Sequence, residues 1–271
     1  MPPELHPVPD QAPPARSSFW RQLRSVLGPV LLCGTLLVKL GSKLKVLLLG
    51  AKFLVPALKT VGSMGVTIAV YSQLWGWKYA AGFVFLILVH EWGHVLAARH
   101  SGLPVSAPVF IPFFGAFILL KKAPRNAWIE AKVALGGPLL GSAAAFVCHL
   151  AGLAFHQPLF IALAWSGYSL NLFNLIPVGQ LDGGRIVTAI SPWLWIPGLL
   201  LLCGFLWQHP TSIILWIILP AAIFRTLSLF RKSGGEDPRY YEVPAGKRLL
   251  VGCAYFGLAA ALALGTLVRV R

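Results

Sequence analysis

Two histidines four residues apart enclose a glutamate in the segment H-E-W-G-H at residues 90–94. On a helix, side chains four positions apart lie one above the other, so the imidazoles of His90 and His94 can reach one metal ion. Glu91 then lies beside that ion, where its carboxylate can accept a proton from water. A bound metal lowers the pKa of such water toward about 7. The spacing therefore predicts a metal-dependent hydrolytic site.

A third metal ligand is needed, because catalytic zinc usually has three protein ligands and one water. The best candidate is Asp182, in the segment N-L-I-P-V-G-Q-L-D-G-G-R at residues 174–185. Six of the eight acidic residues have ordinary positions in the tail, in the linker or at a helix start, whereas Glu91 and Asp182 lie within or beside apolar stretches, where an ionisable group is costly and indicates a function. An alternative for Asp182 is an N-cap on a helix that begins at Gly183. Other candidates fit less well: His100 lies six residues beyond His94, off the same helix face, and no companion motif accompanies His149, His156 or His209.

The composition places this site in a membrane protein. Of 271 residues, 57% are hydrophobic and only 11% are charged, with a mean hydropathy of +0.74. Soluble globular domains carry about 25% charged residues. Several apolar stretches reach the roughly 18–20 residues that a membrane-spanning helix needs. These figures predict a polytopic membrane protein and exclude a disordered chain, a coiled coil and a disulfide-rich secreted module.

The elements expected to position the site are helices. The apolar stretches predict spans at about 61–76, 79–99, 131–154, 158–177, 193–207, 212–229 and 249–268. The apolar segment 104–120 is broken by Pro104, Pro108, Pro112 and Gly115, and proline breaks helices. Irregular backbone cannot lie bare in lipid, so this segment predicts a β-rich re-entrant or membrane-surface hairpin. The fold class expected is an all-α polytopic membrane protein with about six to seven transmembrane helices and this hairpin.

Composition also divides the chain into five parts. Residues 1–24 are rich in proline and predict a flexible cytoplasmic tail. In 25–60, lysines that recur every seven residues predict amphipathic membrane-associated helices, with one shallow membrane hairpin as the alternative. The intramembrane core is expected over 61–230, a cytoplasmic linker over 231–248, and a C-terminal transmembrane helix over 249–271.

The basic residues that give the chain its net charge of +15 flank the predicted spans. Basic residues gather in cytoplasmic loops of membrane proteins, so the expected partner of this charge is the lipid bilayer and no nucleic-acid partner is expected. Only Lys78, Arg269 and Arg271 fall on the opposite side. The distribution predicts a cytoplasmic N-terminus. The residues on the cytoplasmic side are Lys59, Arg99, Lys121, Lys122, Arg125, Arg185, Arg225, Arg231, Lys232, Arg239, Lys247 and Arg248.

The pair of motifs resembles the site-2 protease family of intramembrane zinc metalloproteases, over roughly residues 60–230. The resemblance implies that His90, His94 and Asp182 bind Zn²⁺ and that Glu91 is the general acid and base. It implies a catalytic role for Asn174, whose amide would bind the substrate or the oxyanion; a buried helix–helix hydrogen bond is the alternative. The implied activity is hydrolysis of peptide bonds in or near transmembrane segments of membrane-anchored protein substrates, in regulated intramembrane proteolysis.

Two positions depart from the family pattern. Many members carry an asparagine where Gly141 stands, in the segment G-G-P-L-L-G-S at 136–142. Small residues there predict close helix packing. Gln180 replaces a proline that is frequent before the leucine of the L-D-G-G segment. Asn171 is assigned a structural role only, and the oligomeric state is left open.

Cleavage of a transmembrane substrate requires its helical backbone to unwind locally. A helical substrate keeps its carbonyls in hydrogen bonds, so it must unwind before attack, and we expect substrates with helix-destabilising residues near the cleavage point. The 105–118 hairpin could receive the unwound strand by edge addition. The alternative is ordinary core packing of its aromatic residues, which are Phe110, Phe113, Phe114 and Phe117.

Other functional classes fit the sequence less well. A membrane metal transporter or sensor would need polar groups across both leaflets, yet the far halves of the predicted spans are almost wholly apolar. A non-catalytic scaffold that binds transmembrane helices would have no use for a buried base at Glu91. A membrane zinc protease with a glutamate as third ligand is disfavoured, because no later span contains a glutamate.

Overall fold

The computed structural model describes residue 39 and the ranges 54–179, 181–230 and 238–267. The chain divides into the units Met1–Val55 and Pro56–Arg271, and nearly all described residues belong to the second. The predictions for the tail at 1–24 and for most of 25–60 lie outside the described residues, as does Gln180.

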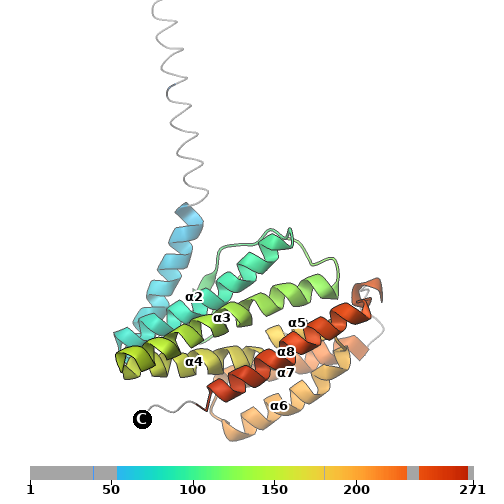
Figure 1. Cartoon of the computed structure of the whole chain (residues 1–271). Coiled ribbons are helices and arrows are strands. Elements are labelled where there is room, and N and C mark those ends of the chain that lie inside the picture. The colour runs from blue at the N-terminus through green and yellow to red at the C-terminus, as the bar shows by residue number, and fades with distance from the viewer. Residues whose placement is uncertain (1–38, 40–53, 180, 231–237, 268–271) are drawn as a thin grey trace, which may run out of the picture. The chain divides into compact units, whose positions relative to one another are not determined.

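The described chain is mostly helical, as the composition predicts (Figure 1). Within the described ranges, four helices are long and apolar enough to cross a membrane: Leu54–Trp75, α2 (Trp77–His100), α3 (Ala127–Phe155) and α8 (Ala245–Gly265). The shorter helices are α4 (Pro158–Asn174), α5 (Asp182–Thr188), α6 (Trp195–Gln208) and α7 (Ile213–Phe230), with short 3₁₀ turns η1 (Pro192–Leu194) and η2 (Pro238–Tyr241). The count of six to seven transmembrane helices stays a prediction.

The helix Leu54–Trp75 begins before the span predicted at 61–76. Its described part includes Lys59, whose side chain is exposed. A single lysine on an exposed helix face therefore does not end the helix. Gly76, with a φ of 79°, separates this helix from α2.

Helices α2, α3 and α4 lie side by side and form the scaffold around residues 90–94 (Figure 1). Glycines allow this packing: a Cβ on Gly93 of α2 would lie 2.1 Å from the carbonyl oxygen of Gly136 on α3. Gly167 of α4 packs in the same way on Ala145 of α3, where a Cβ would lie 2.7 Å from the alanine methyl. Close approach at small residues, as expected for the 136–142 segment, is how membrane helices gain packing contacts.

The segment between α2 and α3 forms the expected β-hairpin. Strands β1 (Val109–Ile111) and β2 (Gly115–Phe117) are antiparallel, with Phe110 opposite Ala116. The outer edge of β1 is covered by the helix Leu54–Trp75, whose Ser63 hydroxyl accepts a hydrogen bond from the Phe110 N–H (3.1 Å). Of the described residues, β2 pairs with β1 alone.

Core packing, the alternative given for the aromatic residues of the hairpin, holds for part of the set, and reception of a substrate strand stays a prediction. Phe110 is buried and packs in a cluster with Tyr71, Val84 and Ile87. The remaining phenylalanines of the hairpin are exposed: Phe113, Phe114 and Phe117. Core packing therefore accounts for Phe110 only.

Candidate metal centre

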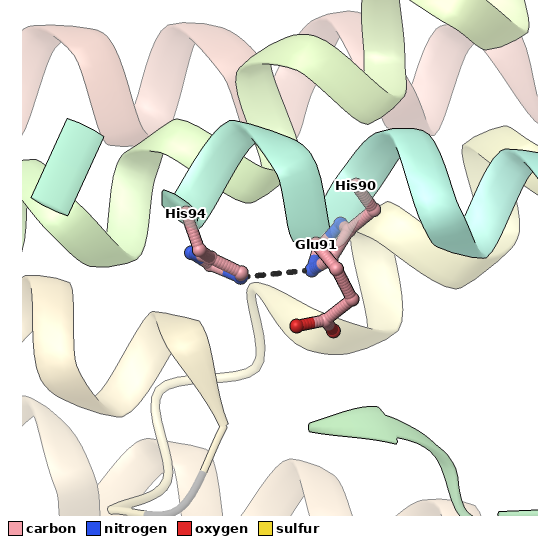
Figure 2. Close-up of side chains that lie close together, drawn as sticks. All are labelled: His90, Glu91 and His94. Carbon is pink, nitrogen blue, oxygen red and sulfur yellow. Dashed lines mark hydrogen bonds between the residues drawn. The ribbon is translucent and has the colours of Figure 1, made fainter. Parts of the chain in front are cut away.

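Helix α2 presents the H-E-W-G-H segment with both histidines on one face, as the spacing of four predicts (Figure 2). The Nε2 atoms of His90 and His94 lie 3.1 Å apart. A carboxylate oxygen of Glu91 lies within 4.8 Å of both imidazoles. All three side chains are buried, with exposed fractions of 3%, 7% and 5% for residues 90, 91 and 94.

Asp182, the first residue of α5, completes this group. Its Oδ2 atom lies 3.1 Å from Nε2 of His90 and 3.2 Å from Nε2 of His94. The Asp182 side chain is buried between these imidazoles, with an exposed fraction of 9% for the residue. The structure thus brings the Asp182 carboxylate to two imidazoles that lie far from it in the sequence.

Helix α5 holds Asp182 in place. Asp182 is its first residue, and the N-cap is Leu181, so the alternative that Asp182 caps the helix is wrong. The two glycines that follow allow α5 to lie against the chain after α4. A Cβ on Gly183 would lie 2.1 Å from the carbonyl oxygen of Leu175, and one on Gly184 would lie 2.1 Å from that of Val178. Any larger residue would displace α5 and its carboxylate.

An ion pair connects α5 to α3. The Arg185 Nε atom donates to Glu130 Oε1 (3.2 Å), and the hydroxyl of Tyr240 donates to the other oxygen of Glu130. Glu130 lies in the first turn of α3, which Asn126 caps by accepting a hydrogen bond from the Ile129 N–H (3.0 Å). The pair therefore fixes the helix that carries Asp182 to the helix that contacts His94.

The outer nitrogens of the two imidazoles fix the orientation of the rings. His94 Nδ1 lies 2.9 Å from the Val133 carbonyl oxygen, and His90 Nδ1 lies 2.8 Å from Asn171 Oδ1. Because these oxygens only accept hydrogen bonds, both Nδ1 atoms carry the proton in the neutral rings. Each Nε2 therefore points a lone pair at the other and at the Asp182 carboxylate.

This donor set fits zinc. Ligands about 2.0–2.1 Å from a tetrahedral zinc ion are about 3.3–3.4 Å from each other, close to the 3.1–3.2 Å separations of the three donor atoms. Two lone pairs and a carboxylate facing one another repel unless a cation lies between them. His90, His94 and Asp182 are the residues that would hold this cation, with Glu91 beside it.

The other candidate residues lie apart from this group. Asn174 is the last residue of α4 and is partly exposed, and its predicted catalytic role stays a prediction. The four further histidines lie at helix ends or against other partners: His100, His156 and His209 are exposed and His149 contacts Tyr168. Sequence reasoning missed the contact of Asn171 with His90. The signal available was an amide in the middle of an apolar stretch, where it needs a partner.

Comparison with known proteins agrees with the geometry. The model of peptidase family M50 matches residues 78–159 and 152–195. The chain is 31% identical to the chloroplast protein EGY2 of Oryza sativa subsp. indica, over 39% of this chain and 27% of that protein. It is 30% identical to the protein MJ0392 of Methanocaldococcus jannaschii, over 47% of this chain and 38% of that protein. It is 33% identical to Rip3 of Mycobacterium tuberculosis, over 48% of this chain and 35% of that protein.

All three relatives are named as zinc metalloproteases. The aligned part spans well under half of the length of each. The matched region contains α2, α3, α4 and α5, which carry every residue of the metal centre. The predicted cofactor, zinc, is confirmed as that of the family, and the four long apolar helices agree with an integral membrane protein. Residues 78–195 therefore match peptidase family M50, the site-2 protease family of zinc metalloproteases, which the two sequence motifs also resemble.

Proposed function

We propose that this protein is an intramembrane zinc protease that hydrolyses peptide bonds in or near the transmembrane segments of membrane-anchored proteins. The observation that carries the proposal is the meeting of Asp182 of α5 with His90 and His94, which lie on an apolar helix long enough to cross a membrane; the three donor atoms lie within 3.2 Å of one another. In this proposal these three residues bind the zinc ion, and Glu91 is the general acid and base.

In this proposal the zinc ion and the side chains of the protein have different roles in peptide hydrolysis. Bound zinc supplies a Lewis acid that polarises the scissile carbonyl and lowers the pKa of water. The Glu91 carboxylate accepts the proton of the attacking water and delivers it to the amine nitrogen as the peptide bond breaks. His90 and His94 keep their Nδ1 protons throughout, because Asn171 and Val133 accept them. The buried surroundings of Glu91 keep other water away from this proton.

The depth of the site supports a membrane substrate. Nine residues of α2 follow Glu91 before the helix ends at His100, which corresponds to about 13–14 Å at 1.5 Å per residue. A scissile bond at that depth belongs to a chain that itself enters the membrane. In this proposal the substrate is a transmembrane segment with helix-destabilising residues, whose cleavage releases a protein domain from the membrane.

The hairpin is the proposed receiver of the unwound substrate. β2 contacts α2, and a strand of the hairpin lies on the side of α2 toward which the Glu91 carboxylate points (Figure 2). The edge of β1 is occupied by the helix Leu54–Trp75, through Ser63 and through Thr60, whose hydroxyl donates to the Pro108 carbonyl oxygen (2.6 Å). The edge of β2 is therefore the one that an extended substrate can join.

The charge pattern supports a cytoplasmic location for the N-terminus and for the end of α2 nearest the site. Exposed basic residues lie at the end of α2, in the connection to α3 and at the start of α8: Arg99, Lys121, Lys122, Arg125, Lys247 and Arg248. At the opposite end of α2 the exposed basic residue is Lys78. Basic residues mark the cytoplasmic side of membrane helices.

The proposal is tested with the purified chain in liposomes that contain a model substrate, a single transmembrane helix with a central glycine–asparagine pair. We expect zinc-dependent cleavage by the wild type. Glu91→Gln removes the base but leaves the three proposed ligands, so it should keep the zinc ion and lose cleavage. Cleavage by Glu91→Gln at the wild-type rate would contradict the proposal. Zinc flux across the same liposomes, with no cleavage, would instead support a transporter.

A further inference from the structure

Asn171 of α4 contacts the metal centre without belonging to the donor set. Its side chain is buried, with an exposed fraction of 1%, and its Oδ1 atom lies 2.8 Å from Nδ1 of His90. The Nδ2 atom donates to the carbonyl oxygen of Gly167 (2.7 Å). A carbonyl oxygen only accepts, so this bond fixes which end of the amide faces His90. Oδ1 therefore faces the imidazole as an acceptor.

We propose that Asn171 is a positioning residue that holds His90 in the tautomer whose Nε2 lone pair faces the metal. A neutral imidazole carries one proton, on Nδ1 or on Nε2. The acceptor at Asn171 Oδ1 selects the form with the proton on Nδ1. Groups that orient metal-binding imidazoles in this way affect metal affinity by about 10–100-fold. The inference rests on the proposed function only in taking His90 as a zinc ligand.

Gly141 of α3 leaves the space that the Asn171 amide occupies. A Cβ on Gly141 would lie 2.5 Å from Oδ1, 2.9 Å from Nδ2 and 3.0 Å from Cγ of Asn171. The amide is held on both sides by hydrogen bonds, so it could not move aside without losing one of them. The absence of a side chain at position 141 is therefore part of the same arrangement.

Two substitutions of Asn171 distinguish a role in positioning His90 from a role in packing alone. Asn171→Leu keeps the approximate size of the side chain but removes the acceptor, so the zinc affinity should fall by about 10–100-fold. Asn171→Asp keeps an acceptor facing His90 Nδ1, and a carboxylate accepts this hydrogen bond at least as well. Its zinc affinity should stay within about threefold of the wild type. A role in packing alone predicts the reverse order, because a buried leucine is tolerated better than a buried charge.

The experiment measures the zinc affinity of the purified full chain in detergent by competition with a chelator, and it needs no substrate. Gly141→Ala should weaken zinc binding when Asn171 is present and have little effect in the Asn171→Ala background, where the amide is absent. Ser142→Ala, whose hydroxyl donates to the carbonyl oxygen of Pro138 in its own helix, is the matched control on α3 and should bind as the wild type does.

The outcomes separate this inference from the proposed function. Weak binding by Asn171→Leu with retained binding by Asn171→Asp supports it even where no cleavage is seen. The opposite order, equal affinity of both variants, or no zinc binding by the wild type would overturn it. If Asn171→Leu does not fold, the test is the effect of Gly141→Ala on zinc affinity in the wild-type and Asn171→Ala backgrounds. An equal loss of zinc affinity in both backgrounds would overturn the inference.

Discussion

The backbones of Gly93 and Gly136 are in direct contact where α2 passes α3, and a Cβ on Gly93 would lie 2.1 Å from the carbonyl oxygen of Gly136. This contact lies one residue before His94, whose Nδ1 bonds to the Val133 carbonyl oxygen on the same stretch of α3. A Cβ on Gly137 would likewise lie 2.2 Å from Nε2 of His94. The distance between α2 and α3 therefore sets the position of one proposed ligand.

Gly93→Ala should separate the two helices and weaken the metal site. Overpacking of a close contact costs about 1–3 kcal/mol of stability, and here the displacement also moves His94 away from Asp182. We expect a lower thermal unfolding temperature in detergent and a lower zinc affinity. Gly257→Ala in α8 is the matched control, since a Cβ there has no atom within 4 Å and alanine favours the helix. Equal behaviour of the two variants would mean that the contact at Gly93 is not required.

Removing zinc should destabilise the fold as well as stop the reaction. Without a cation, the Nε2 lone pairs of His90 and His94 and the Asp182 carboxylate face one another within 3.2 Å. A ligand that binds only the folded chain stabilises it by about 2.7 kcal/mol at a concentration one hundred times its dissociation constant. Chelation should therefore lower the unfolding temperature, and added zinc should restore it.

Substitution of a proposed ligand tests whether the stabilisation by zinc arises at this site. Asp182→Ala should have a low unfolding temperature that no longer responds to zinc, because the carboxylate that the cation needs is absent. His100→Ala, at the exposed end of α2, should respond as the wild type does. A full zinc response in Asp182→Ala would show that the cation binds elsewhere.

Sequence reasoning located the main parts of the site because each leaves a local signal. Histidines four residues apart identify one helix face, and an acidic residue beside apolar stretches identifies Asp182. Contacts between helices leave no such signal. Asn171 was assigned a structural role only, and Gly141 was assigned close packing, because nothing in the chain says that these positions of α3 and α4 face each other beneath His90. Their relation depends on the rotation of two packed helices, which residue order alone does not define.

Arg185 and Glu130 should couple energetically, since both side chains are partly buried and the Nε–Oε1 distance is 3.2 Å. In a double-mutant cycle, Arg185→Ala and Glu130→Gln should each lower the free energy of unfolding, and the double variant should lose less than their sum by about 1 kcal/mol. Tyr240→Phe tests the second hydrogen bond to Glu130. Strictly additive losses would mean that the pair does not hold α5 against α3.

The edge of β2 should be required for cleavage but not for zinc binding. Phe110 and Ala116 are opposite each other, and the Phe110 N–H points away from the hairpin to Ser63. In an antiparallel pair of this kind both residues direct their N–H groups outward, so the Ala116 N–H lies on the free edge of β2.

Ala116→Pro removes that donor without removing a hydrogen bond of the hairpin, and proline is tolerated on strand edges. One hydrogen bond contributes about 0.5–1.5 kcal/mol, so cleavage of the model transmembrane substrate should fall by about 2- to 10-fold at unchanged zinc affinity. Ala116→Ser keeps the N–H and should cleave as the wild type does. Equal cleavage by the proline and serine variants would exclude addition of the substrate to this edge.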